Sequence, residues 1–308
     1  MPIATAELPP LKIALGPDQT DVFNAGLPVL AGEPVEDFFS AARPAGRAGS
    51  LALFQLDDWL LGAATVPLAP GLEATTHRLY LDILQAARDR HLARIWNYVP
   101  AINGPGTADL ENYHSFCRGR SRAFEQYFGA GIKTLLPSAS AVGSKSGTLT
   151  VAFAASATRP RHIENPLQMP AYEYPCEHGP RAPSFARATV VPGPGHAAVF
   201  ISGTAAIRGH GTVAPHNIRA QLACTVENLR EISGACGLGP GLNHGGNSSR
   251  HFKIYVRHAA DQPLVAAALE ESLLHRQDRV SYLQADICRS ALLVEIEATL
   301  LGVTALRA

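Results

Sequence analysis

The chain has 308 residues, of which 46% are hydrophobic and 17% charged, and its 26 Lys and Arg residues balance its 26 Asp and Glu residues. This length favours two domains or one large domain, and the apolar content suffices for a large core, which excludes wholesale disorder. The zero net charge argues against a nucleic-acid partner, because such binders carry a surplus of Lys and Arg for phosphate contacts.

The residues 1–48 are rich in Pro, Gly and Ala and predict an irregular N-terminal extension with one or two short strands. Regular patterns begin after this segment. The elements expected next are two strands within 50–68 joined at Asp57–Asp58, a helix over about 76–91 capped by Thr75 or Thr76, a strand over 94–100, a helix or two helical turns over 109–128, and strands over 136–143 and 148–156.

Six prolines between residues 157 and 184 predict a long irregular connection. The same order of elements then returns. It consists of a hairpin over 187–207, a helix over about 216–232 with Asn217 near its start, a strand over 252–258, a helix over about 262–275, and strands over 280–285 and 292–300.

This recurrence predicts an internal duplication and an α+β fold, with mixed β-sheets and helices packed on one face of each sheet. The predicted divisions are an N-terminal extension (1–48), a first domain (49–158), a Pro-rich connection (159–183) and a second domain (184–308).

The five cysteines form no CxxC pair, so a disulfide framework or a zinc site of paired cysteines is not expected. The histidines are scattered, and His210 and His216 flank a turn without a HExxH-like pattern, so no metal site is expected. The chain start lacks a basic stretch before an apolar run, and no stretch has the roughly 18 uninterrupted apolar residues of a membrane span. The sequence therefore predicts a cytoplasmic protein without a membrane partner.

The last predicted strand carries two carboxylates, Glu295 and Glu297, on one face, because alternate residues of a strand share a face. One interpretation is a solvent-facing sheet surface. The other is a carboxyl group in a cleft, where partial burial would raise its pKa and make it a general acid near neutral pH. Cys288 lies seven residues before Glu295; a lone cysteine is usually a small buried side chain, and a nucleophilic thiol assisted by Arg289 is the minority alternative.

Arginines cluster within 116–122 and 180–187. Such clusters in a chain of low charge suggest an anionic ligand, because guanidinium pairs bidentately with carboxylate. The alternative is a solvated helix face for the first cluster, although residues two apart cannot all share one face, and a structural loop contact for Arg181. Gly203 ends a strand and permits close approach of another group. The glycine-rich 237–249 lacks a phosphate-loop pattern and predicts a flexible loop.

Several long stretches resemble one family. They are RIWNYVPAIN, ENYHSFCRGRSRAFE, LPSASAVG, ENPLQMPAYEYPCEHGPRAPSFARA, SGTAAIRGHGT and DICRSALLVEIEA. Together they resemble the chorismatase (chorismate hydrolase, 3-hydroxybenzoate synthase) family, which is built on a duplicated YjgF-type, chorismate-mutase-like fold, and residues 184–308 resemble one such unit. The resemblance implies removal of the enolpyruvyl group of chorismate with release of pyruvate and without a cofactor.

The resemblance also implies site residues. Glu295 matches the catalytic glutamate, which would protonate the enolpyruvyl methylene or help the leaving group depart. Arg118, Arg181 and Tyr174 fall in stretches that resemble the substrate-carboxylate clamp, with Tyr172 as the alternative to Tyr174.

The product follows from a further pair of matching positions. Gly203 and Cys288 match the branch that forms 3-hydroxybenzoate, so the resemblance implies this product. A third branch also releases 4-hydroxybenzoate, which is the co-product to be considered for this chain. The hydrolytic branch tends to carry Ala at both positions and yields a dihydroxycyclohexadiene carboxylate.

Two other functions remain open on the sequence. An imine deaminase of the YjgF type would hold its substrate carboxylate through an arginine before the final strands, where Arg279 stands. A non-catalytic small-molecule sensor could use the same scaffold. YjgF-type proteins are trimers, and a duplicated chain can satisfy part of that symmetry internally, so we expect a monomer.

Overall fold

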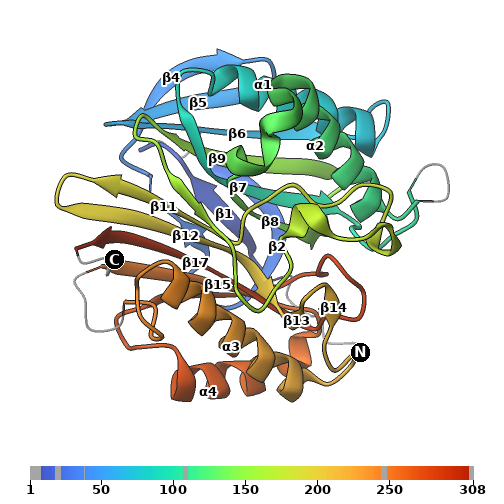
Figure 1. Cartoon of the computed structure of the whole chain (residues 1–308), viewed down its shortest axis with the longest axis vertical. Helices are drawn as coiled ribbons and strands as arrows, with labels where there is room; N and C mark the ends of the chain where they lie inside the picture. The colour runs from blue at the N-terminus through green and yellow to red at the C-terminus, as the bar shows by residue number, and fades with distance from the viewer. Residues whose placement is uncertain (1–7, 18–21, 38, 107–109, 244–247, 305–308) are drawn as a thin grey trace, which may run out of the picture.

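Two β-sheets lie face to face, and a pair of helices covers the outer face of each, which gives four layers (Figure 1). The computed structural model describes residues 8–17, 22–37, 39–106, 110–243 and 248–304. None of the helices in these ranges is long and apolar enough to cross a membrane.

The first sheet has six strands. In spatial order they are β4 (Arg43–Ala48), β5 (Leu51–Leu56), β6 (Trp59–Pro67), β9 (Thr148–Ser156), β7 (His91–Pro100) and β8 (Ser138–Ser144). The helices α1 (Leu72–Ala86) and α2 (Asn112–Phe128) pack on it, and the 3₁₀ turn η2 (Gly129–Leu135) follows α2. Helix α1 begins before the predicted start, so Thr75 and Thr76 are buried within it rather than capping it.

The second sheet has nine strands. In spatial order they are β10 (Arg161–Ile163), β11 (Ala188–Gly193), β12 (His196–Ala205), β17 (Val294–Val303), β15 (Ser249–Val256), β16 (Arg279–Gln284), β2 (Val22–Gly32), β1 (Pro10–Ala14) and β3 (Val35–Glu36). Its helices are α3 (Ile218–Ala235) and α4 (Gln262–Ser272), the latter preceded by the 3₁₀ turn η5 (Ala259–Asp261). The short turns η3 (Ala171–Glu173) and η4 (Cys176–His178) and the small hairpin of β13 (Ile207–Arg208) and β14 (Gly211–Thr212) lie outside both sheets.

The strand orders confirm the internal duplication and the α+β class. The order β5-β6-β9-β7-β8 in one sheet recurs as β11-β12-β17-β15-β16 in the other. In each unit one parallel pair, β7 with β8 or β15 with β16, joins antiparallel neighbours, and a helix lies between the paired strands in the chain. The mixed sheets follow from this repeated connection.

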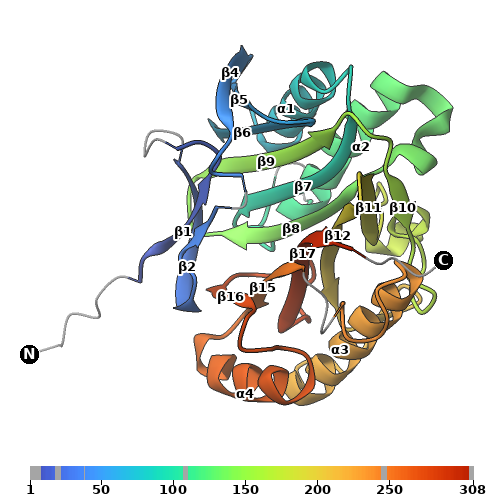
Figure 2. The same ribbon diagram turned by 90° about the vertical axis from the view of Figure 1, so that its left-hand side faces the viewer.

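The N-terminal residues differ from the prediction of a mostly irregular extension. Strands β1, β2 and β3 extend the second sheet, with β2 antiparallel to β16 (Figure 2). Ala25, Leu27 and Val29 of β2 alternate into the core between the sheets. Because Gly26 and Pro28 interrupt the local strand signal, the pairing with a distant edge decides the structure here.

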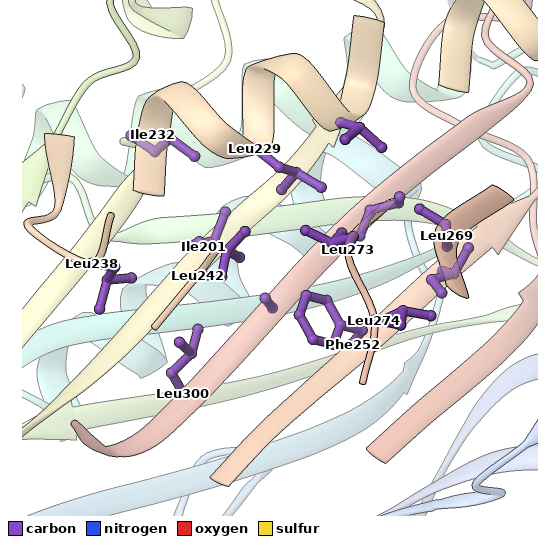
Figure 3. Close-up of a cluster of buried hydrophobic side chains, with 14 of the residues drawn as sticks. Ile201, Leu229, Ile232, Leu238, Leu242, Phe252, Leu269, Leu273, Leu274 and Leu300 are labelled. Carbon is purple, nitrogen blue, oxygen red and sulfur yellow. The ribbon is translucent and has the colours of Figure 1, made fainter. Parts of the chain in front are cut away.

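The helix-side core of the second unit explains why α3 forms where it does. Leu229 and Ile232 on one helix face pack toward the strands that carry Ile201 and Phe252 (Figure 3). Asn217 caps the helix, its side chain accepting a hydrogen bond from the backbone N–H of Ala220 at 3.1 Å, as the sequence predicts. The packed helix holds β12 and β17 in place from behind, and these two strands carry residues of the site described next.

Candidate active site

A cavity of about 180 Å³ opens between the two units. Its walls come from α2, β8, β12, β17, the loop before β17 and the Pro-rich connection. The residues that line it are Glu111, Tyr113, His114, Arg120, Ala139, Ser140, Ala141, Tyr174, Glu177, His178, Pro183, Phe185, Arg187, Gly203, Ala205, Ile207, Cys288, Arg289, Ser290 and Glu295. Four predicted site residues, Glu295, Cys288, Tyr174 and Gly203, thus meet in one place.

Glu297 lies next to the cavity, at the centre of a buried ionic network between the sheets. Its carboxylate accepts from Trp96 Nε1 and Tyr255 Oη, each at 2.9 Å, and forms ion pairs of 2.8 Å with Arg94 and Lys253. Burial alone would raise its pKa, but Lys253 and Arg94 hold the pKa of Glu297 at about 2. Glu297 is therefore an anion at neutral pH.

Glu295 lies two residues away on the same face of β17, but its carboxyl group is neutral where that of Glu297 is ionised. The side chain is buried, and burial together with the neighbouring Glu297 anion raises the pKa of Glu295 to about 8. Its carboxyl group therefore holds a proton at neutral pH. This arrangement excludes a solvent-facing position for the two carboxylates and fits the general-acid interpretation.

Gly203 makes room for this carboxyl group. A Cβ atom at position 203 would lie 2.0 Å from Glu295 Oε1 and 2.7 Å from Cδ. No side chain except hydrogen fits there unless Glu295 moves. Gly203 therefore fixes where the proton of Glu295 is presented.

Cys288 lines the cavity as a neutral thiol. Burial and the nearby Glu295 raise the pKa of Cys288 to about 12, against the opposing effect of Arg289. A thiol with this pKa is protonated at neutral pH and is a poor nucleophile. The raised pKa argues against the minority alternative of an activated thiolate, and the position of Cys288 in the wall gives it a role in shaping the cavity.

Two buried arginines in the cavity wall form no ion pair with a carboxylate in the part of the chain that the structure describes. Arg120 lies under the Phe116 and Phe185 rings, 5.0 and 5.9 Å from their centres, and its Nε has no hydrogen-bond partner. Arg187 donates to Met169 O at 2.9 Å and Tyr174 Oη at 2.7 Å, and its Nε is likewise unpartnered. Because buried guanidinium groups require a partner, both indicate an anionic ligand.

The arginines predicted from the sequence as the clamp lie outside the cavity. Arg118 pairs with Glu73 at 3.3 Å, and Arg181 pairs with Glu125 at 2.6 Å, both at half-exposed positions. These are surface ion pairs that leave little of the guanidinium for a ligand. Arg120 and Arg187, rather than Arg118 and Arg181, line the cavity.

Tyr174, rather than Tyr172, faces the cavity. The Tyr174 ring lies between two guanidinium groups, 5.7 Å from Arg187 and 5.2 Å from Arg289. Tyr172 lies beside Lys133 at the edge of the first unit's helix-side core. Arg289 is a further cavity residue; its Nη2 has no hydrogen-bond partner.

The buried arginines had a weak signal in the sequence. Arg120 stands between small and apolar residues on the inner face of α2, and Arg187 directly precedes the apolar strand β11. An arginine on an otherwise apolar face is rarely buried without a function, because burial of its charge is costly. The spacing of the arginines within 116–122 and 180–187 does not by itself distinguish the buried arginine of each cluster from its exposed neighbours.

A protonated carboxyl group beside buried guanidinium groups defines an acid–base site for a small anionic molecule. Comparison with known proteins gives the family. Residues 37–155 match the family model described as chorismatase FkbO/Hyg5-like, N-terminal. A chorismatase of Streptomyces rapamycinicus is 37% identical over 265 residues, which cover 83% of this chain and 78% of the relative.

Two further relatives agree with this match. A 3-hydroxybenzoate synthase of Streptomyces hygroscopicus is 36% identical over 79% of this chain and 74% of its own length. A chorismatase crystal structure superposes with a TM-score of 0.75 and 33% identity, covering 83% of this chain and 80% of the other. The chain therefore belongs to the chorismatase family of enzymes.

The Glu297 network predicts a large loss of stability on removal of its central charge. Glu297→Gln leaves Arg94 and part of Lys253 unpaired in the core, so we expect the free energy of unfolding to fall by about 3–5 kcal/mol. Since the pKa of Glu297 lies below its ordinary value, this stabilisation is present above about pH 4.5 and is lost as the pH falls toward about 2. Urea titration measures it.

The matched control is Glu125→Gln, which breaks the exposed pair with Arg181 and should cost no more than about 1 kcal/mol. Equal losses for the two variants would contradict a special role for the Glu297 network.

Proposed function

We propose that this chain converts chorismate to 3-hydroxybenzoate and pyruvate without a cofactor, with Glu295 as the general acid. The observation that carries the proposal is the protonated carboxyl of Glu295 in a cavity with two buried guanidinium groups that form no ion pair with a carboxylate among the described residues. Chorismate is a dicarboxylate with an acid-labile enol ether. Arg120 and Arg187 supply the two positive charges that such a substrate requires.

The proposed reaction balances without water. Glu295 transfers its proton to the enolpyruvyl methylene carbon, which becomes the methyl group of pyruvate. The bond between the ring carbon and the ether oxygen breaks, and its electron pair forms the pyruvate carbonyl. The oxygen of the neighbouring ring hydroxyl attacks the ring carbon to form a protonated epoxide. The bond from this oxygen to its original ring carbon then breaks, and loss of the proton on the attacked carbon makes the ring aromatic. The Glu295 carboxylate can take up that proton, which restores the acid.

Gly203 and Cys288 support intramolecular attack over hydrolysis, because both line the cavity and match the branch of the family that forms 3-hydroxybenzoate. Gly203 allows the Glu295 carboxyl to lie against β12, and an alanine there would displace it. The 3-hydroxybenzoate synthase of Streptomyces hygroscopicus is among the relatives of this chain. 4-Hydroxybenzoate is a second product of the same route when the other carbon–oxygen bond of the epoxide breaks.

The deaminase alternative has less support. Arg279, which would hold the substrate carboxylate, forms an ion pair with Asp37 and does not line the cavity. The sensor alternative leaves the proton on Glu295 without a use. Both alternatives predict that the protein releases no pyruvate from chorismate.

The direct test is incubation of the metal-free protein with chorismate and chromatographic identification of the products. We expect pyruvate and 3-hydroxybenzoate in equal amounts. Glu295→Gln keeps the shape but lacks the transferable proton, so kcat should fall by roughly 10²- to 10⁴-fold. In the wild type, activity should decline as the pH rises past about 8, where Glu295 loses its proton.

Pyruvate with a non-aromatic diol would retain the family reaction but reject the product. Full turnover by Glu295→Gln would reject the general-acid role, and an absence of turnover in the wild type would favour the sensor or deaminase.

The revised carboxylate clamp is tested by exchange of arginine for lysine, which keeps the charge but not the bidentate geometry. Arg187→Lys should lower kcat/KM for chorismate by roughly 10- to 100-fold through loss of charge-assisted hydrogen bonds. Arg118→Lys and Arg181→Lys, which alter exposed ion pairs, should stay within about twofold of wild type. The reverse ranking would restore the assignment made from the sequence.

Gly203→Ala tests the placement of the acid. The added methyl group must displace the Glu295 carboxyl, so 3-hydroxybenzoate formation should slow and the share of non-aromatic diol should rise. Gly234→Ala in α3 is the matched control, because a Cβ there meets nothing within 4 Å. An unchanged rate and product ratio for Gly203→Ala would show that the carboxyl position is unimportant.

A further inference from the structure

Glu177, His178 and His210 bring three potential metal ligands together at the cavity rim. Glu177 and His178 come from the turn η4 in the Pro-rich connection, and His210 comes from the tight turn between β13 and β14. Their ligand atoms lie close together, with 2.9 Å between His178 Nε2 and His210 Nδ1 and 3.3 and 3.2 Å from these two atoms to Glu177 Oε1. Among the described residues, this is the one group of three or more such side chains close enough to hold a metal.

These separations match a metal-binding face. Three ligands about 2.1 Å from a zinc ion, at angles between a right angle and the tetrahedral angle, lie about 3.0–3.4 Å apart. Hydrogen bonds explain three mutually close atoms less well than a metal ion does. Each imidazole nitrogen carries at most one proton, and it cannot donate that proton to both of its neighbours at once. A cation near the centre of the face contacts all three atoms at once.

The surrounding chain fixes the two histidines. The turn that carries His210 is held to the connection by backbone bonds from Met169 N to Gly209 O at 2.9 Å and from Gly209 N to Leu167 O at 3.0 Å. The backbone oxygen of His210 accepts from Arg289 Nη1 at 2.8 Å. On the other side, the His178 ring packs 5.4 Å from that of Tyr174. Two of the three ligands are thus positioned before a metal arrives, which lowers the entropic cost of binding.

The electrostatics allow a cation. The Glu177 carboxylate supplies one negative charge, and its exposed position gives an ion direct access from solvent. Arg289 opposes a cation, but its guanidinium is drawn toward Thr212 and the Tyr174 ring.

We propose that Glu177, His178 and His210 form a binding site for a divalent transition-metal ion of the zinc class. Two imidazoles and one carboxylate form a donor set of this class, and oxygen-preferring ions such as magnesium are poorly served by it. Because Glu177 and His178 also line the cavity, the ion lies where an anionic ligand enters. Binding of the ion itself does not depend on the proposed reaction with chorismate.

The test is equilibrium dialysis of the chelator-treated full chain against zinc chloride, with absorption spectra of the cobalt(II) form as a second readout. We expect one zinc ion per chain and a cobalt spectrum that reports bound imidazole nitrogen. His178→Ala and His210→Ala should each weaken binding by more than the roughly 10- to 100-fold that loss of an outer-shell partner costs. His196→Ala, an exposed histidine at the start of β12, is the matched control and should bind as the wild type does.

Cys176→Ser checks for a different ligand set, because this exposed thiol is two residues from His178. The variant should keep the wild-type affinity. The proposal is overturned if the wild type binds no zinc, if both histidine variants bind as tightly as the wild type, or if Cys176→Ser abolishes binding. None of these measurements uses chorismate, so a failure here is distinguishable from a failure of the proposed reaction.

Discussion

The buried anion of Glu297 is the interaction on which the site depends. It joins the two sheets, because its partners Arg94 and Trp96 come from β7 and its partners Lys253 and Tyr255 come from β15. Burial is the larger cause of the raised pKa of Glu295, and the Glu297 anion, two residues along the same strand face, raises it further. The two carboxylates of this strand thus differ in pKa because their surroundings differ. Glu297 contacts two cations and two hydrogen-bond donors, whereas Glu295 faces the cavity. Glu297 thus stabilises the fold, while Glu295 presents a proton to the cavity.

The two units of the duplication place different residues at equivalent positions of their sheets. On β17 the residues paired with Lys253 and Tyr255 are Glu297 and Glu295. On β9, the strand in the same place of the first sheet, the residues paired with Trp96 and Tyr98 are Ala152 and Thr150. The second unit therefore contributes both acids, while the groups that stabilise Glu297 come from both units. A site between units of a repeat can combine these contributions without any change in the strand order.

Local sequence patterns were sufficient for most of the fold, because helices such as α3 and hairpins such as β5–β6 carry their own signals. The extent of the N-terminal strands was underestimated because β2 contains Gly26 and Pro28 and depends on pairing with β16, more than two hundred residues away. The face of Glu295 followed from strand alternation, but burial on that face depends on the other sheet. The arginines show the same limit: Arg118 and Arg120 are two residues apart on α2, and only the packing of the helix buries one and exposes the other.

The N-terminal segment also completes the charge balance of the site. Glu36 of β3 forms a 2.6 Å ion pair with Lys253, which in turn contacts Glu297. Burial alone would lower the pKa of Lys253, but Glu297 and Glu36 together hold it above its ordinary value. Lys253 therefore bridges two buried carboxylates, and the N-terminal segment supplies one of them. A segment remote in sequence thus takes part in the buried network around Glu297 without lining the cavity.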